Sequence, residues 1–274
     1  MALMAFSTAC VASMTASIRL VPGDLHPFEI AFFRNFIGLL LLLGWHIKGG
    51  LRIFQTRQIH LHALRGGLNV LAMLAYFFAV TITPLAEIAA MGFTAPLFAA
   101  PLAFLLLREK AHWYRVLVVA IGFSGAMAIL RPGAETLNLG AMLVLLSSFL
   151  WALALMVIKV LSRTESAATI ALYMVVFMAP LSLLAALPYW QGPNLHQLAW
   201  LALIALLGTL AQLSLGQSFK FADSTAVMPL DFLKLIWGAM LGYWLFSESP
   251  DIWTWLGGAV IFSSATWLAL KESR

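Results

Sequence analysis

The chain has 274 residues, of which 62% are hydrophobic and 10% are charged. Soluble domains carry roughly 25% charged residues, so this composition and a mean hydropathy of +0.95 exclude an ordinary soluble protein and predict one domain embedded in a lipid bilayer. The net charge of +5 then reports on membrane topology rather than on nucleic-acid binding, and the single cysteine, Cys10, excludes an intramolecular disulfide.

Ten membrane-spanning helices are predicted from the apolar runs of the sequence, because a helix needs about 20 mainly apolar residues to cross the hydrocarbon core. In chain order, the predicted spans cover residues 2–20, 28–47, 60–80, 86–107, 113–130, 139–160, 167–187, 197–219, 225–246 and 252–270. The first is predicted as a span rather than a cleaved signal peptide, because no basic residue precedes Arg19.

Basic residues are distributed unevenly between the two ends of these spans. With a cytoplasmic N-terminus, only Arg19 and Arg131 lie on the outer side. Eleven lie near cytoplasmic span ends, namely Lys48, Arg52, Arg57, Arg108, Lys110, Arg115, Lys159, Arg163, Lys220, Lys271 and Arg274. Because cytoplasmic loops carry an excess of Lys and Arg, we expect an all-α membrane protein with both termini in the cytoplasm.

The two halves of the chain resemble each other. A shift of 139 positions aligns Glu109 with Glu248, Phe93 with Phe232 and FSGA at 123 with FSSA at 262, and it also superposes span on span. Residues 1–131 and 139–270 are therefore predicted to be two five-helix repeats that together form one membrane domain. Since five is odd, the second repeat enters the membrane inverted, an architecture that many secondary transporters share.

Three segments carry a resemblance to a known family: HPFEIAFFRNFIG in the second span, TPLAEIAAMGFTAPLF around the fourth, and REKAHWYRVLVVAIGFSGAMAILRPG through the fifth. With the arrangement of five plus five spans, they resemble the EamA-type branch of the drug/metabolite transporter superfamily over essentially the whole chain. The resemblance implies a central cavity lined mainly by the first four spans of each half, with the fifth and tenth spans peripheral. It implies no universal binding signature.

Asp231 and Lys234 lie deep within the predicted ninth span. At three positions apart they share a helix face, and a charge facing lipid would cost roughly 2.5–3.5 kcal/mol, so this face should meet protein or water. Either the two charges neutralise each other as a structural pair, or they border the cavity, where Lys234 receives an anionic group of the substrate. Asp231 is also the candidate for proton coupling, although Lys234 would favour its ionised form.

A second polar stripe follows the third span, where His62, Arg65, Asn69 and Tyr76 recur at spacings of three, four and seven. Arg65 either lines the cavity or extends to the lipid headgroups. Asn69 and Tyr76 are deeper in the membrane or toward its far side, so they either line the cavity or form hydrogen bonds between helices.

Other spans add four polar or aromatic candidates for contact with a substrate: Arg34, Gln212, Trp151 and Trp237. A role in tying helices together or in core packing stays open for each of them. Pro84, Pro96, Pro180 and Pro229 either kink their helices in the ordinary way or free backbone carbonyls beside a cavity.

No catalytic, nucleotide-binding or local metal-binding motif is present in the sequence, so we expect no enzyme, no cofactor and no nucleic-acid partner. The preferred hypothesis is a secondary transporter of a small polar or amphipathic metabolite, such as a carboxylate-bearing amino acid, in a bacterial inner membrane. Uptake of a vitamin or nucleotide-derived cofactor is the alternative among transporters. A non-transporting membrane subunit or lipid-handling scaffold is the alternative outside them. Membrane lipids are expected partners, and a homodimer stays open.

Overall fold

The computed structural model describes residues 2–46, 56–107, 113–130, 138–165, 167–221, 230–231 and 233–272. Six of the basic residues that predict the membrane orientation lie outside these ranges, namely Lys48, Arg52, Arg108, Lys110, Arg131 and Arg274. The predicted start of the ninth span, including Pro229, lies outside them as well.

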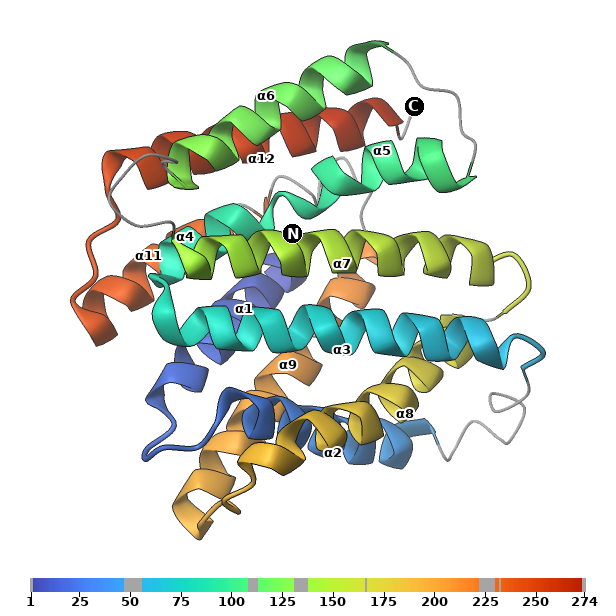
Figure 1. Cartoon of the computed structure of the whole chain (residues 1–274), viewed down its shortest axis with the longest axis vertical. Helices are drawn as coiled ribbons and strands as arrows, with labels where there is room; N and C mark the ends of the chain where they lie inside the picture. The colour runs from blue at the N-terminus through green and yellow to red at the C-terminus, as the bar shows by residue number, and fades with distance from the viewer. Residues whose placement is uncertain are drawn as a thin grey trace.

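Within the described ranges every regular element is a helix, as expected (Figure 1). The elements are α1 (Ala2–Leu20), α2 (Pro27–His46), α3 (Ile59–Ile82), α4 (Leu85–Gly92), α5 (Ala95–Leu107), α6 (Trp113–Leu130), α7 (Leu139–Leu161), α8 (Ala167–Ala186), the 3₁₀ turn η3 (Leu187–Tyr189), α9 (Leu195–Phe221), α11 (Leu233–Phe246) and α12 (Ile252–Glu272). Among the described residues, six helical segments are long and apolar enough to cross a membrane, and α4 and α5 together form one of them, Leu85–Leu106. The chain is therefore a multi-pass membrane protein.

The fourth predicted span is broken between α4 and α5. At the break, the N–H of Phe93 donates to the carbonyl of Ala90 at 3.3 Å and the N–H of Thr94 donates to that of Met91 at 3.0 Å, so the last turn of α4 tightens. Pro96 has no N–H, and the carbonyl of Gly92 therefore lacks its usual helical partner four residues ahead. With the 139-residue shift, Gly92 aligns with Asp231, which lies in a short turn just before α11.

Polar contacts between loops define the two ends of the bundle. Arg19 at the end of α1 pairs with Glu248, which follows α11, so these helix ends share one face. The other end of the bundle contains the start of α1 and the end of α12, and we call it the terminal face. The end that contains Arg19, Glu248 and the start of α12 lies across the bundle from it, and we call it the opposite face. At the terminal face Thr56 donates to Glu165 at 2.7 Å and Gln58 donates to Thr164 at 2.9 Å.

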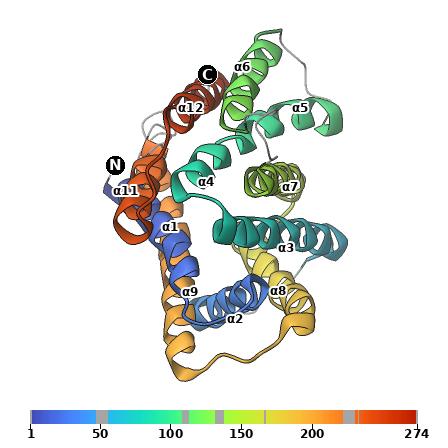
Figure 2. The same cartoon turned by 60° about the vertical axis from the view of Figure 1, so that its left-hand side comes forward.

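Packing between helices joins segments that are far apart in the sequence. The helix α1 packs against α9, α3 against α7 and α8, and α6 against α12. In both views α6 and α12 lie together at one end of the molecule and α2, α8 and α9 at the other (Figure 1, Figure 2). The helices α1, α3, α4 and α7 lie in the region between these two groups.

Two glycines allow α6 and α12 to approach closely. A Cβ atom at Gly257 would lie 2.6 Å from the carbonyl oxygen of Gly125, and one at Gly125 would lie 2.7 Å from the carbonyl oxygen of Gly257. Because both obstacles are backbone atoms, they cannot move aside as a flexible side chain can. Small residues at such crossings are the usual way in which membrane helices pack closely.

Replacing Gly257 by Ala is therefore expected to destabilise the protein by about 1–3 kcal/mol, the usual cost of overpacking a tight contact. The melting temperature of the purified protein in detergent measures this. The matched control is Gly67→Ala in α3, where an added Cβ meets nothing within 4 Å. Equal melting temperatures for the two variants would contradict the close crossing.

Candidate functional site

Three adjoining cavities of about 180, 440 and 300 Å³ lie inside the bundle. The first lies toward the opposite face, between Thr15, Leu85 and Lys234. The second extends from Lys234 toward Met4 and Thr266, near the terminal face. The third lies to the side, lined by α2, α3, α7 and α9 among others. All three share Gly92, the last residue of α4, so the helix break forms their junction.

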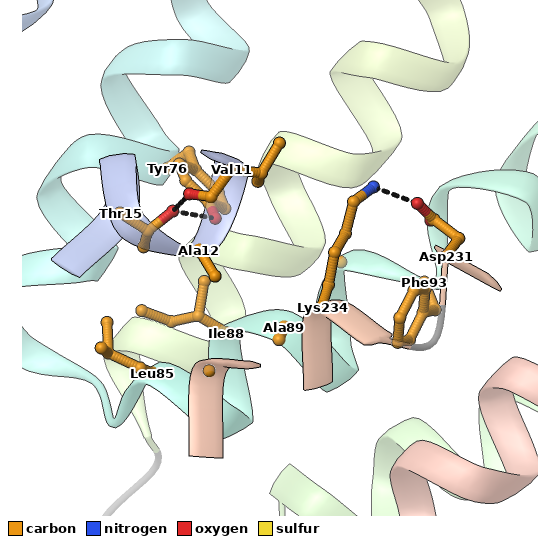
Figure 3. A pocket seen from close by; sticks show the side chains of 12 residues that line it. Val11, Ala12, Thr15, Tyr76, Leu85, Ile88, Ala89, Phe93, Asp231 and Lys234 are labelled. Atoms are coloured by element: carbon orange, nitrogen blue, oxygen red, sulfur yellow. Dashed lines mark hydrogen bonds and ion pairs between the residues drawn. The ribbon is translucent and has the colours of Figure 1, made fainter. Parts of the chain in front are cut away.

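Asp231 and Lys234 form the ion pair that their spacing predicts, with Nζ and Oδ1 2.5 Å apart. Both line the first and the second cavity, and each side chain is 29% exposed. In Figure 3 the ammonium group of Lys234 reaches toward Asp231 beside Phe93. Asp231 precedes the first turn of α11, where a carboxylate is favoured by the helix dipole. The pair thus presents one positive and one negative group to the same open space.

Asn69 lines the third cavity and is only 2% exposed. Neither its amide oxygen nor its amide nitrogen has a hydrogen-bond partner among the described residues. An unsatisfied buried amide costs about 1–3 kcal/mol. Because the amide borders a cavity, a bound molecule could make the missing hydrogen bonds.

Four further predicted residues also lie at these cavities. Arg34, Gln212 and Trp151 line the third cavity, and Trp151 lines the second as well. Tyr76 lines the first and third cavities and its hydroxyl lies 3.3 Å from that of Thr15 (Figure 3). Arg34 donates to the side chain of the adjacent Asn35 at 3.1 Å, which holds its guanidinium at the cavity wall.

Arg65 and Trp237 line none of these three cavities. Arg65 is 6% exposed and turns toward α8, where it donates to the carbonyl of Ile170 at 2.5 Å and to the sulfur of Met174 at 3.3 Å. It therefore does not extend to lipid headgroups. The indole N–H of Trp237 is buried and finds no partner in the described part of the chain.

The lining also includes residues that the sequence pattern did not predict, above all Gly92 and Phe93. Phe262 and Thr266 of α12 line the second cavity, although the family resemblance implied that the tenth span is peripheral. The fifth span, α6, contributes to none of the three cavities. Only the proline near the break in the fourth span could have pointed to Gly92.

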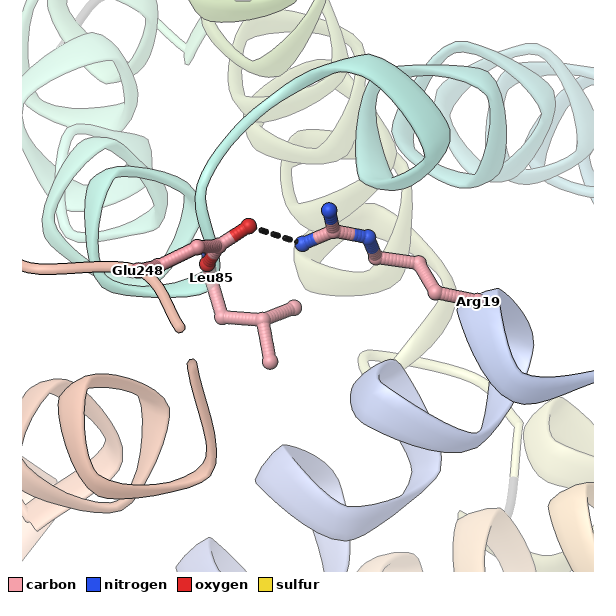
Figure 4. Close-up of polar contacts among 3 residues, drawn as sticks. All are labelled: Arg19, Leu85 and Glu248. Atoms are coloured by element: carbon pink, nitrogen blue, oxygen red, sulfur yellow. Dashed lines mark hydrogen bonds and ion pairs between the residues drawn. The ribbon is translucent and has the colours of Figure 1, made fainter. Parts of the chain in front are cut away.

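A cluster around Arg19 joins the two halves at the opposite face (Figure 4). Arg19 pairs with Oε1 of Glu248, and Oε2 of Glu248 accepts from the backbone N–H of Leu85 at 2.9 Å. The guanidinium carbon of Arg19 also lies 4.2 Å from the centre of the Phe246 ring. Because Leu85 lines the first cavity, this cluster covers that cavity on the opposite face.

The turn after α11 positions Glu248. Ser247 has a φ of 55°, a value that few residues other than glycine adopt, and the N–H of Glu248 donates to the carbonyl of Gly242 at 3.0 Å. A Cβ atom at Gly242 would lie 2.9 Å from the Glu248 carboxylate. The turn and the glycine together let the carboxylate fold back over α11 toward Arg19.

Comparisons with known proteins agree with this architecture. The model of the EamA-like transporter family matches residues 1–131 and again residues 138–270. The chain is 31% identical to an S-adenosylmethionine uptake transporter of Rickettsia bellii, over 91% of this chain and 86% of that one. It is 33% identical to a riboflavin transporter of Vibrio cholerae, over 89% of this chain and 83% of that one. A solved crystal structure, 19% identical with a TM-score of 0.61, covers 100% of this chain and 96% of its own, which shows a shared fold. The chain therefore belongs to the EamA-like transporter family and is a multi-pass membrane transporter of the drug/metabolite type.

Proposed function

We propose that this protein takes up a nucleoside-derived metabolite with a charged, amino-acid-like tail, by alternating access across a bacterial inner membrane. The ion pair of Asp231 and Lys234 at the wall of two cavities carries this proposal. A zwitterionic tail can replace the internal pair by two new pairs, its carboxylate at Lys234 and its ammonium at Asp231, so that the charges of the tail and of the two side chains all keep a partner of opposite sign.

The relatives support the same choice. One group of them is named for uptake of S-adenosylmethionine, which combines a purine nucleoside with an amino-acid tail. This favours the vitamin or nucleotide-derived cofactor alternative over export of a simple amino acid. The substrate would contact Lys234, Asp231, Asn69, Arg34, Gln212, Tyr76 and Trp151, which line the cavities. For Arg65 and Trp237 we propose support of neighbouring helices instead.

The proposed topology has ten spans in two inverted five-helix repeats, with both termini in the cytoplasm. The excess of basic residues at the span ends predicted to be cytoplasmic supports this orientation. Gly92 ends α4, and Asp231, at the matching position of the second repeat, lies two residues before α11. Helix ends at these positions support a substrate site at the repeat interface.

Riboflavin is the second candidate substrate, because other relatives carry that name and because Phe93, Trp151 and Phe262 give the second cavity an aromatic wall. Aromatic side chains stack on flat heterocycles. Riboflavin has no charged tail, however, and so it offers no charged groups to pair with Asp231 and Lys234.

Transport by the purified protein in proteoliposomes tests both candidates. We expect exchange of radiolabelled S-adenosylmethionine above the background of protein-free liposomes, and slower exchange of riboflavin. Faster riboflavin exchange would favour the second candidate. Absence of exchange for both, with protein that stays monodisperse and folded, would mean that the substrate is another metabolite and would overturn the proposal.

A further inference from the structure

Gly92 occupies an unusual place in the cavity wall. It is exposed, although it lies at the end of a helix inside the bundle, and it lines all three cavities. A Cβ atom added there would meet nothing within 4 Å. Its φ also lies outside the left-handed range, so the backbone does not require glycine. Neither steric contact nor backbone conformation explains why this position has no side chain.

The cavities that meet at Gly92 offer different chemistry. The first and second hold the ion pair of Asp231 and Lys234. The third holds Asn69, whose amide donor and acceptor are both buried and without partners among the described residues. A carboxamide offers a donor and an acceptor side by side, which match the edge of a heterocycle such as adenine in a bidentate pair.

We propose that Gly92 determines specificity by leaving room for a two-part ligand to lie across the junction of the cavities. The charged end of this ligand lies at Asp231 and Lys234, and its heterocyclic end lies at Asn69. The inference rests on the proposed function and adds to it that the substrate is too long for one cavity. A side chain at position 92 projects into the space between the two ends and separates them.

The test compares Gly92→Ala and Gly92→Leu with Gly67→Ala, which also adds a methyl group in a helix where nothing lies within 4 Å but lines none of these three cavities. The ligands are S-adenosylmethionine and its two halves, methionine and adenosine. Binding is measured for each as the ligand-induced rise in melting temperature, and transport of the whole molecule is measured in proteoliposomes.

We expect Gly92→Ala to slow transport of S-adenosylmethionine by about tenfold, the discrimination typical of one methyl group in a close-fitting site, and Gly92→Leu to reduce it to background. The shifts given by methionine and adenosine should stay as in the wild type, since each half needs only one end of the site. Gly67→Ala should transport at the wild-type rate. Wild-type transport by Gly92→Leu, or equal loss of the whole ligand and of both halves, would overturn the role of Gly92. A wild-type protein that neither binds nor moves S-adenosylmethionine would instead overturn the proposed function.

Discussion

Replacing Lys234 by Met is expected to lower transport of a substrate with a charged tail by at least about thirtyfold, because removing one member of a hydrogen-bonded charge pair in a poorly solvated site costs roughly 2–5 kcal/mol. Methionine keeps most of the length and the apolar stem of lysine. The loss therefore comes from the missing ammonium group, which would otherwise bind the carboxylate of the substrate, and from the unpaired Asp231. Initial rates of uptake into proteoliposomes measure it.

The matched control is Lys271→Met near the end of α12. The ammonium group of Lys271 lies 4.4 Å from the centre of the Tyr114 ring and 4.9 Å from that of Trp267, and this residue lines none of the three cavities. Lys271→Met therefore removes the same charge as Lys234→Met, at a residue outside the candidate site. Transport by this variant should stay within about twofold of the wild type, as is usual for surface substitutions that change stability by less than about 0.5 kcal/mol.

A double variant, Asp231→Asn with Lys234→Met, distinguishes a structural role of the ion pair from a role in binding the substrate. Removing both charges restores neutrality, so melting temperature and expression should return to near the wild-type values. If the pair only neutralises itself, transport should return as well. If it binds the substrate, transport should stay low in a stable protein, and this is the outcome that we expect.

The order and approximate bounds of the helices could be predicted from the sequence because the bilayer fixes the length of an apolar span. Both α1 and α6 have the predicted bounds, and the other described helices follow the predicted spans in order. The break between α4 and α5 could be predicted only in part. Pro96 marked a site where backbone carbonyls can be freed, but ordinary kinks have the same signal.

The candidate site was harder to predict because helical spacing shows which residues share a face and not what that face meets. Arg65 and Asn69 belong to the same predicted stripe of α3, yet Arg65 binds the backbone of α8 while Asn69 lines the third cavity. Gly92 has no side chain and gave no signal of its own. Its importance follows from the space around it, which depends on the packing of α1, α7 and α11.

Neutralising Glu248 by Glu248→Gln is expected to open the first cavity toward the opposite face. The ion pair of Arg19 and Glu248 joins the end of α1 to the turn after α11, and both side chains are largely buried, at 20% and 17% exposure. The amide oxygen of Gln can still accept from Leu85, so the variant removes the charge and little else. The conformation closed at this face then loses about 1–2 kcal/mol of stabilisation. The ratio of open to closed protein should therefore rise roughly 5–30-fold.

In the proposed topology the opposite face lies on the outer side of the membrane, so cysteine labelling from that side measures this opening. Cys10 is the one cysteine of the chain and is 4% exposed, so Cys10→Ala gives a background into which Val11→Cys places a thiol at the wall of the first cavity. A membrane-impermeant maleimide should then react faster in Glu248→Gln than in the parent, and Arg19→Lys, which keeps the charge, should stay close to the parent.

The matched control for this experiment lies at the other end of the bundle. Glu165 accepts a hydrogen bond from Thr56 at the terminal face, so Glu165→Gln makes the same chemical change on the far side of the cavities. Under alternating access, loosening the terminal face cannot favour the conformation that is open at the opposite face. Labelling of Val11→Cys should therefore be unchanged or slower in Glu165→Gln. Equal acceleration by Glu165→Gln and Glu248→Gln would mean general loosening of the bundle, and it would remove the Arg19–Glu248 pair from the gating of the cavity.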